Sequence, residues 1–326
     1  MHVLGLKGSP RKKGSTNFLL TGLLSRLEEK GAQTRIIDTC AGDIQPCREY
    51  KACEKKGFCP ISDDMEKEMY AALRKADIIV AASPVFFFGV TAQLKALVDR
   101  CQVFWARKYR LELKDPSFSI RKGFLLSAGG SRAPRLFDGV RLTARYFFDA
   151  VDAEYTGHLT YSNIENRKDL ESNPAVEADL AGAAETLAKG FEDRTTVLFA
   201  GREAACRSQM AAAFATFGTG GRIRALCAGL SPAERTSPLM VRSMADSGID
   251  MAFRRPESNE TVMDHAAPDI VVTMDETCRN QSLTGVREVC WNLPPAPQIE
   301  GRKMDELRDE IRTLVEELVQ SLERDG

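Results

Sequence analysis

The sequence predicts an α/β protein that consists of two doubly wound domains, each built on a parallel sheet. Three observations predict this class: short apolar segments alternate with helical segments, the alternation restarts near residue 195, and 326 residues are enough for two domains of ordinary size. Parallel strands need crossover connections, and these place helices on both faces of a sheet. We expect the first domain at 1–192 and the second at 195–326.

The first domain begins with an apolar strand at 2–7, a helix at 15–30 and a second strand at 33–39. Four apolar residues of the helix recur at helical spacing, so the three segments form one βαβ unit. The polar stretch 163–173 is expected to be an internal loop. The alternation continues with strands near 78–82, 123–127 and 154–159 and with helices near 64–75, 91–106, 135–149 and 174–190.

The second domain follows the charged stretch 192–194 and is expected to be a smaller α/β sandwich. Its expected strands lie at 195–200, 223–228, 269–274 and 287–291, and its expected helices at 206–217, 237–247 and 303–323.

Composition excludes several classes of protein. Hydrophobic residues make up 43% and charged residues 28%, so the chain can bury a sizeable core. A formal charge of -1 leaves no basic field to bind nucleic acid or an acidic membrane surface. The chain opens without the features of a signal peptide and has no long apolar run, so we expect a cytoplasmic protein. Its nine cysteines should then remain mostly reduced.

A glycine-rich turn at 8–17 joins the first strand to the first helix. Such a turn exposes backbone amides at the positive end of the helix, where a phosphate group binds readily. It has neither the three spaced glycines of a dinucleotide fingerprint nor the Gly-Lys-Ser/Thr of a Walker loop. Alternatively, Ser15 or Thr16 merely caps the helix. The candidate phosphate-binding side chains are Ser9, Arg11, Ser15, Thr16 and Asn17.

The third strand ends in three aromatic residues and a glycine. Strand ends of this kind face the ligand crevice of a parallel sheet, and flat aromatics beside backbone amides suit a planar ring system. The alternative is packing in the core, but three adjacent side chains cannot all face one core. The candidate ring-binding residues are Ser83, Pro84, Val85, Phe86, Phe87, Phe88 and Gly89.

Together these two loops resemble those of the NADPH-dependent FMN reductases, a branch of the flavodoxin-like superfamily, over about residues 1–192. The resemblance implies that the first loop holds the FMN phosphate, that 84–89 contact the isoalloxazine, and that Ser127, Gly129 and Gly130 form a third flavin loop. It also implies hydride transfer from NAD(P)H to the flavin, an electron acceptor still to be identified, no catalytic acid or base from the protein, and a flavin site near the interface of a homodimer.

A cysteine-rich stretch follows the second strand, with Cys47, Cys53 and Cys59 at close spacing. It resembles the motif of iron-sulfur flavoproteins, in which four cysteines hold a [4Fe-4S] cluster, but Tyr50 stands where the second cysteine is expected. Cys40 could supply a fourth thiol only by departing from the family spacing. We expect a structural lid over the flavin. Iron-sulfur ligation by the three cysteines, redox sensing and zinc binding remain alternatives.

The second domain resembles the low-molecular-weight tyrosine phosphatases and their arsenate reductase relatives over nearly all of 195–325. Arg207 sets the register of the phosphate loop, and Gly201 occupies the place of the nucleophilic cysteine. Ala204 replaces the asparagine that orients the loop, and Pro295 stands where the acid is expected. We therefore expect no phosphatase activity.

What remains of this loop is a possible anion site without turnover, formed by Arg202, Cys206, Arg207 and Ser208. The alternative is a scaffold kept for packing or dimer contacts.

The sequence as a whole predicts an FMN-dependent NAD(P)H oxidoreductase, homo-oligomeric, with a disabled phosphatase-like module. The alternatives are an iron-sulfur electron carrier, a non-enzymatic protein that binds an anion or a partner, and an active phosphatase or arsenate reductase that uses Cys206.

Overall fold

The computed structural model describes residues 1–278, 286–296 and 302–325. Its contacts divide the chain into two compact units. The first comprises Met1–Glu112 and Ile120–Glu192, and the second comprises Leu113–Ser119 and Asp193–Gly326. Among the described helices, none is both long enough and apolar enough to cross a lipid bilayer.

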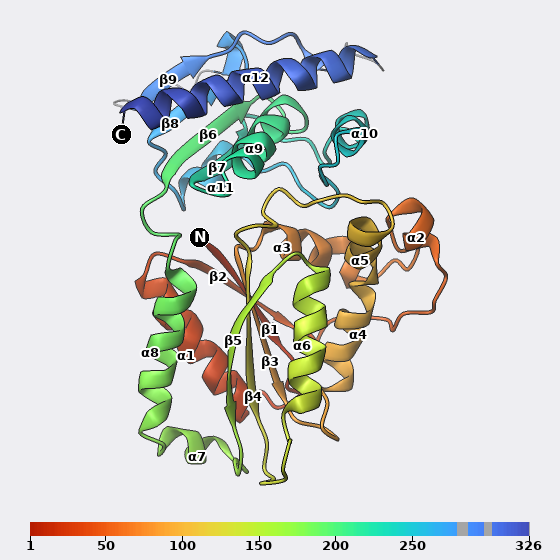
Figure 1. Ribbon diagram of the computed structural model, residues 1–326, viewed down its shortest axis with the longest axis vertical. Coiled ribbons are helices and arrows are strands. Elements are labelled where there is room, and N and C mark those ends of the chain that lie inside the picture. Colours follow the sequence, from red (N-terminus) through yellow and green to blue (C-terminus); the bar gives the residue numbers. More distant parts are fainter. Residues whose placement is uncertain (279–285, 297–301, 326) are drawn as a thin grey trace. The chain divides into compact units, whose positions relative to one another are not determined.

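The first unit contains a five-stranded parallel sheet in the order β2-β1-β3-β4-β5. This is the flavodoxin-like order, which confirms the predicted fold class, and ligands of such sheets bind outside the carboxyl ends of the strands. The carboxyl ends of β3, β4 and β5 lie at the lower end of this unit in Figure 1. The strands are β1 (His2–Lys7), β2 (Gln33–Asp38), β3 (Ile78–Pro84), β4 (Lys122–Ala128) and β5 (Glu154–Tyr161).

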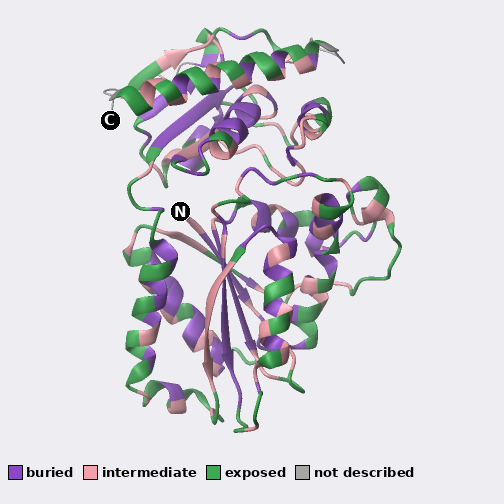
Figure 2. Ribbon diagram, viewed as in Figure 1, coloured by how far each residue is buried: buried purple, intermediate pink, exposed green. Residues whose placement is uncertain are grey.

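Helices cover both faces of this sheet (Figure 1). Helices α1 (Ser15–Glu29) and α8 (Ala175–Ala188) pack on one face, and α4 (Ala92–Arg100), α5 (Gln102–Tyr109) and α6 (Asp138–Ala150) lie on the other. Because both faces are covered, β3 is buried along nearly its whole length, as Figure 2 shows.

Three predicted segments of this unit differ from the structure. The helix expected near 91–106 is two helices, α4 and α5, which meet at Cys101. The helix expected at 64–75 begins with a π-helical turn, Met65–Met69, and continues as α3 (Tyr70–Lys75). The prediction of a loop at 163–173 was wrong, because this stretch contains α7 (Arg167–Glu171). Asn166 and Asp169 form a capping box at the start of α7, a signal that the prediction overlooked.

The second unit contains a four-stranded parallel sheet in the order β7-β6-β8-β9. Helices α9, α10 and α12 share the larger core cluster on one face, and α11 packs on the other face. The elements are β6 (Thr195–Gly201), α9 (Arg207–Gly218), β7 (Ile223–Gly229), α10 (Pro238–Asp246), α11 (Asn259–Met263), β8 (Ile270–Thr273), β9 (Arg287–Cys290) and α12 (Arg302–Asp325).

The segment 113–119 is part of the second unit, although the sequence on both sides of it belongs to the first. The Lys114 amide donates to the Gly248 carbonyl at 2.9 Å, and the Asp250 amide donates to the Lys114 carbonyl at 2.8 Å. The ring of Phe118 lies 5.5 Å from that of Phe217. This part of the second unit was not predicted, because a seven-residue segment carries no periodicity that reveals its partner.

Candidate functional site

The glycine-rich turn of the first unit leads from β1 into α1. The N-cap of α1 is Gly14, which has no side chain, so the amides of the first helical turn are not capped by a side chain. The interpretation that Ser15 or Thr16 caps the helix is therefore wrong. Ser9 is buried and accepts a hydrogen bond from the Arg11 amide at 3.3 Å, whereas the Arg11 side chain is exposed. The turn presents backbone donors and three exposed cationic side chains, Arg11, Lys12 and Lys13, a combination that suits a phosphate.

Glycines keep this turn close to its neighbours. A Cβ at Gly8 would lie 2.8 Å from the Ala82 carbonyl oxygen, and one at Gly14 would lie 3.1 Å from Ser9 Oγ. The hydroxyl of the fully buried Thr91 donates to the Gly8 carbonyl at 2.6 Å and accepts the Leu94 amide as the N-cap of α4. Thr91 thus ties the first loop to the one after β3. Sequence reasoning did not single it out as a site residue, although a threonine before an apolar helix is an N-cap signal.

Two predicted site residues prove to be supports. Ser83 and Ser127 are fully buried, and their hydroxyl groups bond to the backbone. Ser83 Oγ accepts the Thr91 amide at 3.1 Å, and Ser127 Oγ donates to the Ser83 carbonyl at 2.8 Å. Both side chains therefore hold the loops at this edge of the sheet in place rather than offering free donors to a ligand.

The three phenylalanines form a tight, exposed turn after β3. Phe86 and Gly89 exchange two backbone hydrogen bonds of 2.9 Å, and Phe87 and Phe88 have φ values of 47° and 62°. Positive φ at both central positions defines a type I′ turn, which glycine and asparagine normally occupy. The Phe87 side chain is fully exposed, at 105%, and Phe86 and Phe88 are about half exposed. The alternative that these rings pack in the core is wrong, and strained, exposed aromatics of this kind are typical of a binding site.

The loop after β4 lies against this turn. A Cβ at Gly129 would lie 3.4 Å from Val85 Cγ2, and a Cβ at Gly139, in the first turn of α6, would lie 2.2 Å from the Phe88 carbonyl oxygen. Gly130 is exposed. The three predicted loops therefore meet at one edge of the sheet. Gly139 was missed, because its role depends on a contact between elements that are distant in sequence.

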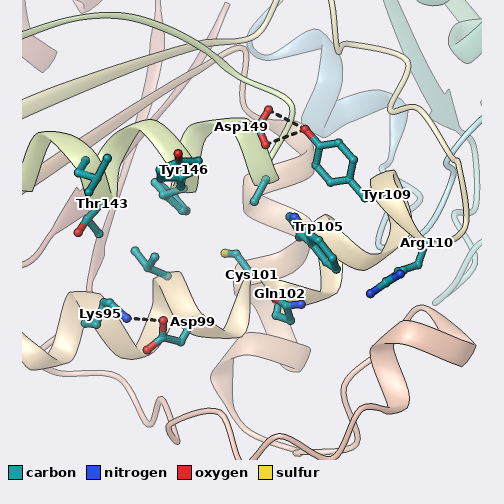
Figure 3. A pocket seen from close by; sticks show the side chains of 14 residues that line it. Lys95, Asp99, Cys101, Gln102, Trp105, Tyr109, Arg110, Thr143, Tyr146 and Asp149 are labelled. Atoms are coloured by element: carbon teal, nitrogen blue, oxygen red, sulfur yellow. Dashed lines mark hydrogen bonds and ion pairs between the residues drawn. The ribbon is translucent and has the colours of Figure 1, made fainter.

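A groove of about 820 Å³ lies between α4, α5 and α6 and was not predicted. Trp105 and Tyr109 of α5 and Tyr146 of α6 line it, and Figure 3 shows Tyr109 directed at Asp149 of α6. The Tyr109 hydroxyl bonds to the Asp149 carboxylate at 2.9 Å. Burial raises the pKa of the Cys101 thiol that lines the groove, so this cysteine is not a nucleophile. The groove offers apolar binding surface rather than reactive chemistry.

The cysteine-rich stretch lies beside the same helices. Cys47, Tyr50, Cys53 and Cys59 line a hollow of about 320 Å³. Cys47 is exposed, Cys53 and Cys59 are half-buried, and burial raises the pKa of Cys53. Within the described part of the chain, no group of three or more His, Cys, Asp or Glu side chains is placed to hold a metal ion.

The loop between β6 and α9 of the second unit turns its carbonyl oxygens outward. The carbonyls of Gly201, Arg202, Glu203 and Ala205 accept the amides of Leu230, Ser231, Ala233 and Ser237, and the Ala204 carbonyl accepts Gln209 Nε2 at 3.0 Å. The carbonyl and the amide of one peptide unit point in opposite directions, so the amides of 202–206 face the other side of the loop. Consecutive backbone amides on one side of a loop are the feature that anion-binding nests share.

The arginine of this loop already has partners. Arg207 Nη2 pairs with the Asp275 carboxylate at 2.8 Å, and Nη1 donates to the Leu293 carbonyl at 2.8 Å. Partial burial acts to raise the pKa of Asp275, but hydrogen bonds from Thr277, Cys278 and Arg207 lower it. Ser208 is buried, its Oγ accepts the Cys227 thiol at 3.3 Å, and Arg202 is exposed.

The expectation that Cys206 lines the anion site is corrected. The side chain is buried, and its sulfur lies 3.9 Å from Met304 Sδ in the core. Burial raises the pKa of Cys206 to about 12, and the lowering by Arg207 is smaller. Its position at the start of α9 therefore does not produce a thiolate.

We expect Cys206 to resist alkylation in the native protein at pH 8. With its pKa near 12, only about one thiol in ten thousand is ionised at that pH, and burial blocks access to it. Cys47, which is exposed, serves as the internal control. Mass spectrometry of peptides after brief iodoacetamide treatment, native against unfolded, measures both. Equal labelling of the two native thiols would show that this account of the loop is wrong.

Comparisons with known proteins agree with both predicted resemblances. Residues 1–137 match the family described as NADPH-dependent FMN reductase. Residues 196–326 match the family described as low molecular weight phosphotyrosine protein phosphatase. The resemblance predicted for each part of the chain is therefore confirmed.

Two curated relatives match the N-terminal part. An iron-sulfur flavoprotein of Methanocaldococcus jannaschii is 41% identical over 100 residues, which are 31% of this chain and 51% of the relative. An iron-sulfur flavoprotein of Archaeoglobus fulgidus is 38% identical over 130 residues, which are 40% of this chain and 63% of the relative. The chain thus spans about half to two thirds of the length of these relatives. A solved NADH:FMN oxidoreductase in its apo form aligns with a TM-score of 0.41 at 20% identity, over 57% of this chain and 87% of that one.

Proposed function

We propose that the first unit binds FMN at the carboxyl edge of its sheet and passes electrons from NAD(P)H to an acceptor. The observation that carries this proposal is the meeting of three loops at that edge. The uncapped start of α1 would take the phosphate, and the exposed turn of Phe86 to Gly89 would contact the ring. The choice of a nicotinamide as electron donor is supported only by the name of the matched family, NADPH-dependent FMN reductase.

FMN, when bound, accepts a hydride equivalent from a nicotinamide and later gives up the electrons. The residues of this chain bind and orient it. Gly8 lets the first loop pack closely against β3, and Gly14 lets it pack against Ser9. Thr91 fixes the distance between the first two loops, and Gly139 lets the aromatic turn approach α6. None of these tasks needs an acid or a base.

The absorption spectrum of anaerobically purified protein, supplemented with FMN, tests the proposal. We expect protein-bound flavin bands that bleach when NADPH or NADH is added. A protein that takes up no FMN, or a bound flavin that neither nicotinamide reduces, would contradict it.

Replacing Ser15 with aspartate is expected to weaken FMN binding about tenfold or more. A carboxylate in this turn would lie close to the phosphate, and like charges a few ångströms apart repel strongly. Aspartate in the first turn of a helix favours the helix, so loss of affinity would not reflect unfolding. Flavin fluorescence titration measures the affinity, and Ser15→Asn, without the charge, is the matched control. Equal affinity in Ser15→Asp would remove this turn from the site.

A second function is proposed for the loop of the second unit, which would bind an oxyanion without cleaving it. The outward carbonyls of 201–205 favour this role, because the amides on the opposite side can surround an anion. Gly201 cannot attack the bound group, since glycine has no nucleophile. Calorimetric titration with inorganic phosphate tests this function, and the absence of binding would leave the module as a scaffold.

A further inference from the structure

We infer that the cysteine-rich loop, residues 43–64, is held in place by protein contacts alone and carries no iron-sulfur cluster, because Tyr50 takes the place of the fourth thiolate. The two curated relatives described above are named iron-sulfur flavoproteins, and such relatives imply a cluster. The residues of this chain do not fit one.

The ligand set is incomplete. A [4Fe-4S] cluster is held by four cysteine thiolates, and the hollow has three, on Cys47, Cys53 and Cys59. The fourth side chain of this motif is the phenol of Tyr50, a hard oxygen donor, which is 56% exposed. Its hydroxyl accepts a hydrogen bond from Arg48 at 3.4 Å.

Neither of the two remaining cysteines of the first unit completes the set. Cys40 is not among the residues that line the hollow, and its amide donates to Asp38 at the end of β2. Cys101 is 1% exposed and lines the separate groove between α4, α5 and α6. Throughout the described ranges, no cluster of potential ligands is placed to hold a metal.

Two arginines anchor the loop. Arg100 of α4 donates to the Gln45 carbonyl at 2.9 Å and to the Ile61 carbonyl at 3.3 Å, and it pairs with Asp63. Arg107 of α5 donates to the Gly57 carbonyl at 3.0 Å. The beginning, middle and end of the loop are thus each bonded to a neighbouring helix.

The carboxylate of Asp63 completes this support. It accepts the amides of Gln45 and Met65, both at 3.0 Å, in addition to the Arg100 guanidinium. Asp63 and Arg100 are both almost fully buried, at 0% and 1% exposed, so their pairing is shielded from water. A loop with such internal support needs no metal to order it, in contrast to small domains that fold only around one.

This inference has a consequence for electron flow, which rests on the proposed FMN function. Without a cluster, the flavin is the one redox group of the first unit, and full reduction takes two electrons per chain. The acceptor must then reach the flavin itself. An iron-sulfur cluster would take up one further electron per chain and would offer the acceptor a second redox group from which to receive electrons.

The test compares wild type with Tyr50→Cys, both produced anaerobically with ample iron and sulfide. Wild type is expected to carry no stoichiometric iron. Tyr50→Cys, which places a fourth thiol at the same hollow, is expected to hold about four iron and four sulfide ions per chain. Tyr50→Ser is the matched control and should resemble wild type. Stoichiometric iron in wild type would overturn the inference, and a Tyr50→Cys protein without iron would overturn the assignment to Tyr50.

Reductive titration with dithionite after addition of FMN separates this inference from the proposed function. Uptake of two electrons per chain, with flavin bleaching, agrees with both. Uptake of three electrons by iron-loaded wild type would contradict the inference and leave the flavin function intact. Absence of both iron and bound flavin would contradict the proposed function and leave the inference standing.

Discussion

Replacing Gly139 with alanine is expected to weaken FMN binding by about 100-fold, because a displacement of about 1 Å in a binding site can have an effect of that size. The added Cβ would lie 2.2 Å from the Phe88 carbonyl oxygen, far inside van der Waals contact. Gly139 is fixed by α6 and Phe88 by a doubly bonded turn, so the turn must move away from the helix. The aromatic platform would then no longer face the ring of the flavin.

Flavin fluorescence titration of the apoprotein measures this effect, and thermal unfolding followed by circular dichroism shows whether the fold persists. Gly182→Ala is the matched control. Its Cβ would meet nothing within 4 Å, and it lies in α8, which contributes no residue to the three loops. Equal affinities in the two variants would show that the turn does not contact the flavin.

The fold could be predicted from the sequence because each strand and most helices have a recognisable apolar pattern within their own residues. The segment at 78–82 is apolar throughout, and the one at 123–127 is apolar except for Ser127, as is typical of strands covered on both faces. They lie within the observed β3 and β4. The break at Cys101 and the helix α7 were missed. A break between two helices leaves the apolar period nearly unchanged, and a five-residue helix is too short to show one.

The site was predictable in its chemistry but not in its contacts. The glycine-rich turn and the aromatic run identified the loops, since those residue types are unusual at strand ends. The sequence could not show that the hydroxyl groups of Ser83 and Ser127 form hydrogen bonds with the backbone. Nor could it show that Thr91 bonds to the first loop or that Gly139 allows the aromatic turn to approach α6. Those roles come from pairs of residues that are distant along the chain and meet only in the folded sheet.

In the cysteine-rich loop, too, the chemistry was predictable from the sequence and the contacts were not. Its departure from the four-cysteine motif is visible at Tyr50 in the sequence, but the reason that the loop keeps its shape is not. That reason lies on α4 and α5, 50 to 55 residues further along, where Arg100 and Arg107 donate to backbone carbonyls of the loop. Charged residues on a predicted helix are normally expected to face solvent, so nothing in the local pattern marks these two as buried.

Replacing Arg100 with methionine is expected to destabilise the first unit by about 3–5 kcal/mol, the usual cost of removing one partner of a buried ion pair. Asp63 would be left at 0% exposure without the guanidinium, and the carbonyls of Gln45 and Ile61 would lose a donor. Denaturant unfolding followed by far-ultraviolet circular dichroism measures the loss. Lys95→Met is the matched control on the same helix, because the Lys95–Asp99 pair is nearly half exposed and contributes at most about 1 kcal/mol.

The double variant Arg100→Met, Asp63→Asn identifies the cause of that loss. If an uncompensated buried charge dominates, removing it should recover more than about 1 kcal/mol relative to Arg100→Met alone, since the asparagine oxygen can still accept a backbone amide. If the lost bonds to the backbone dominate, the double variant should be no more stable than the single one. Either result measures the support that holds the cysteine-rich loop. A loss of under 1 kcal/mol in Arg100→Met would mean that the loop has another anchor, and the argument for a self-supporting loop without a cluster would lose its main physical basis.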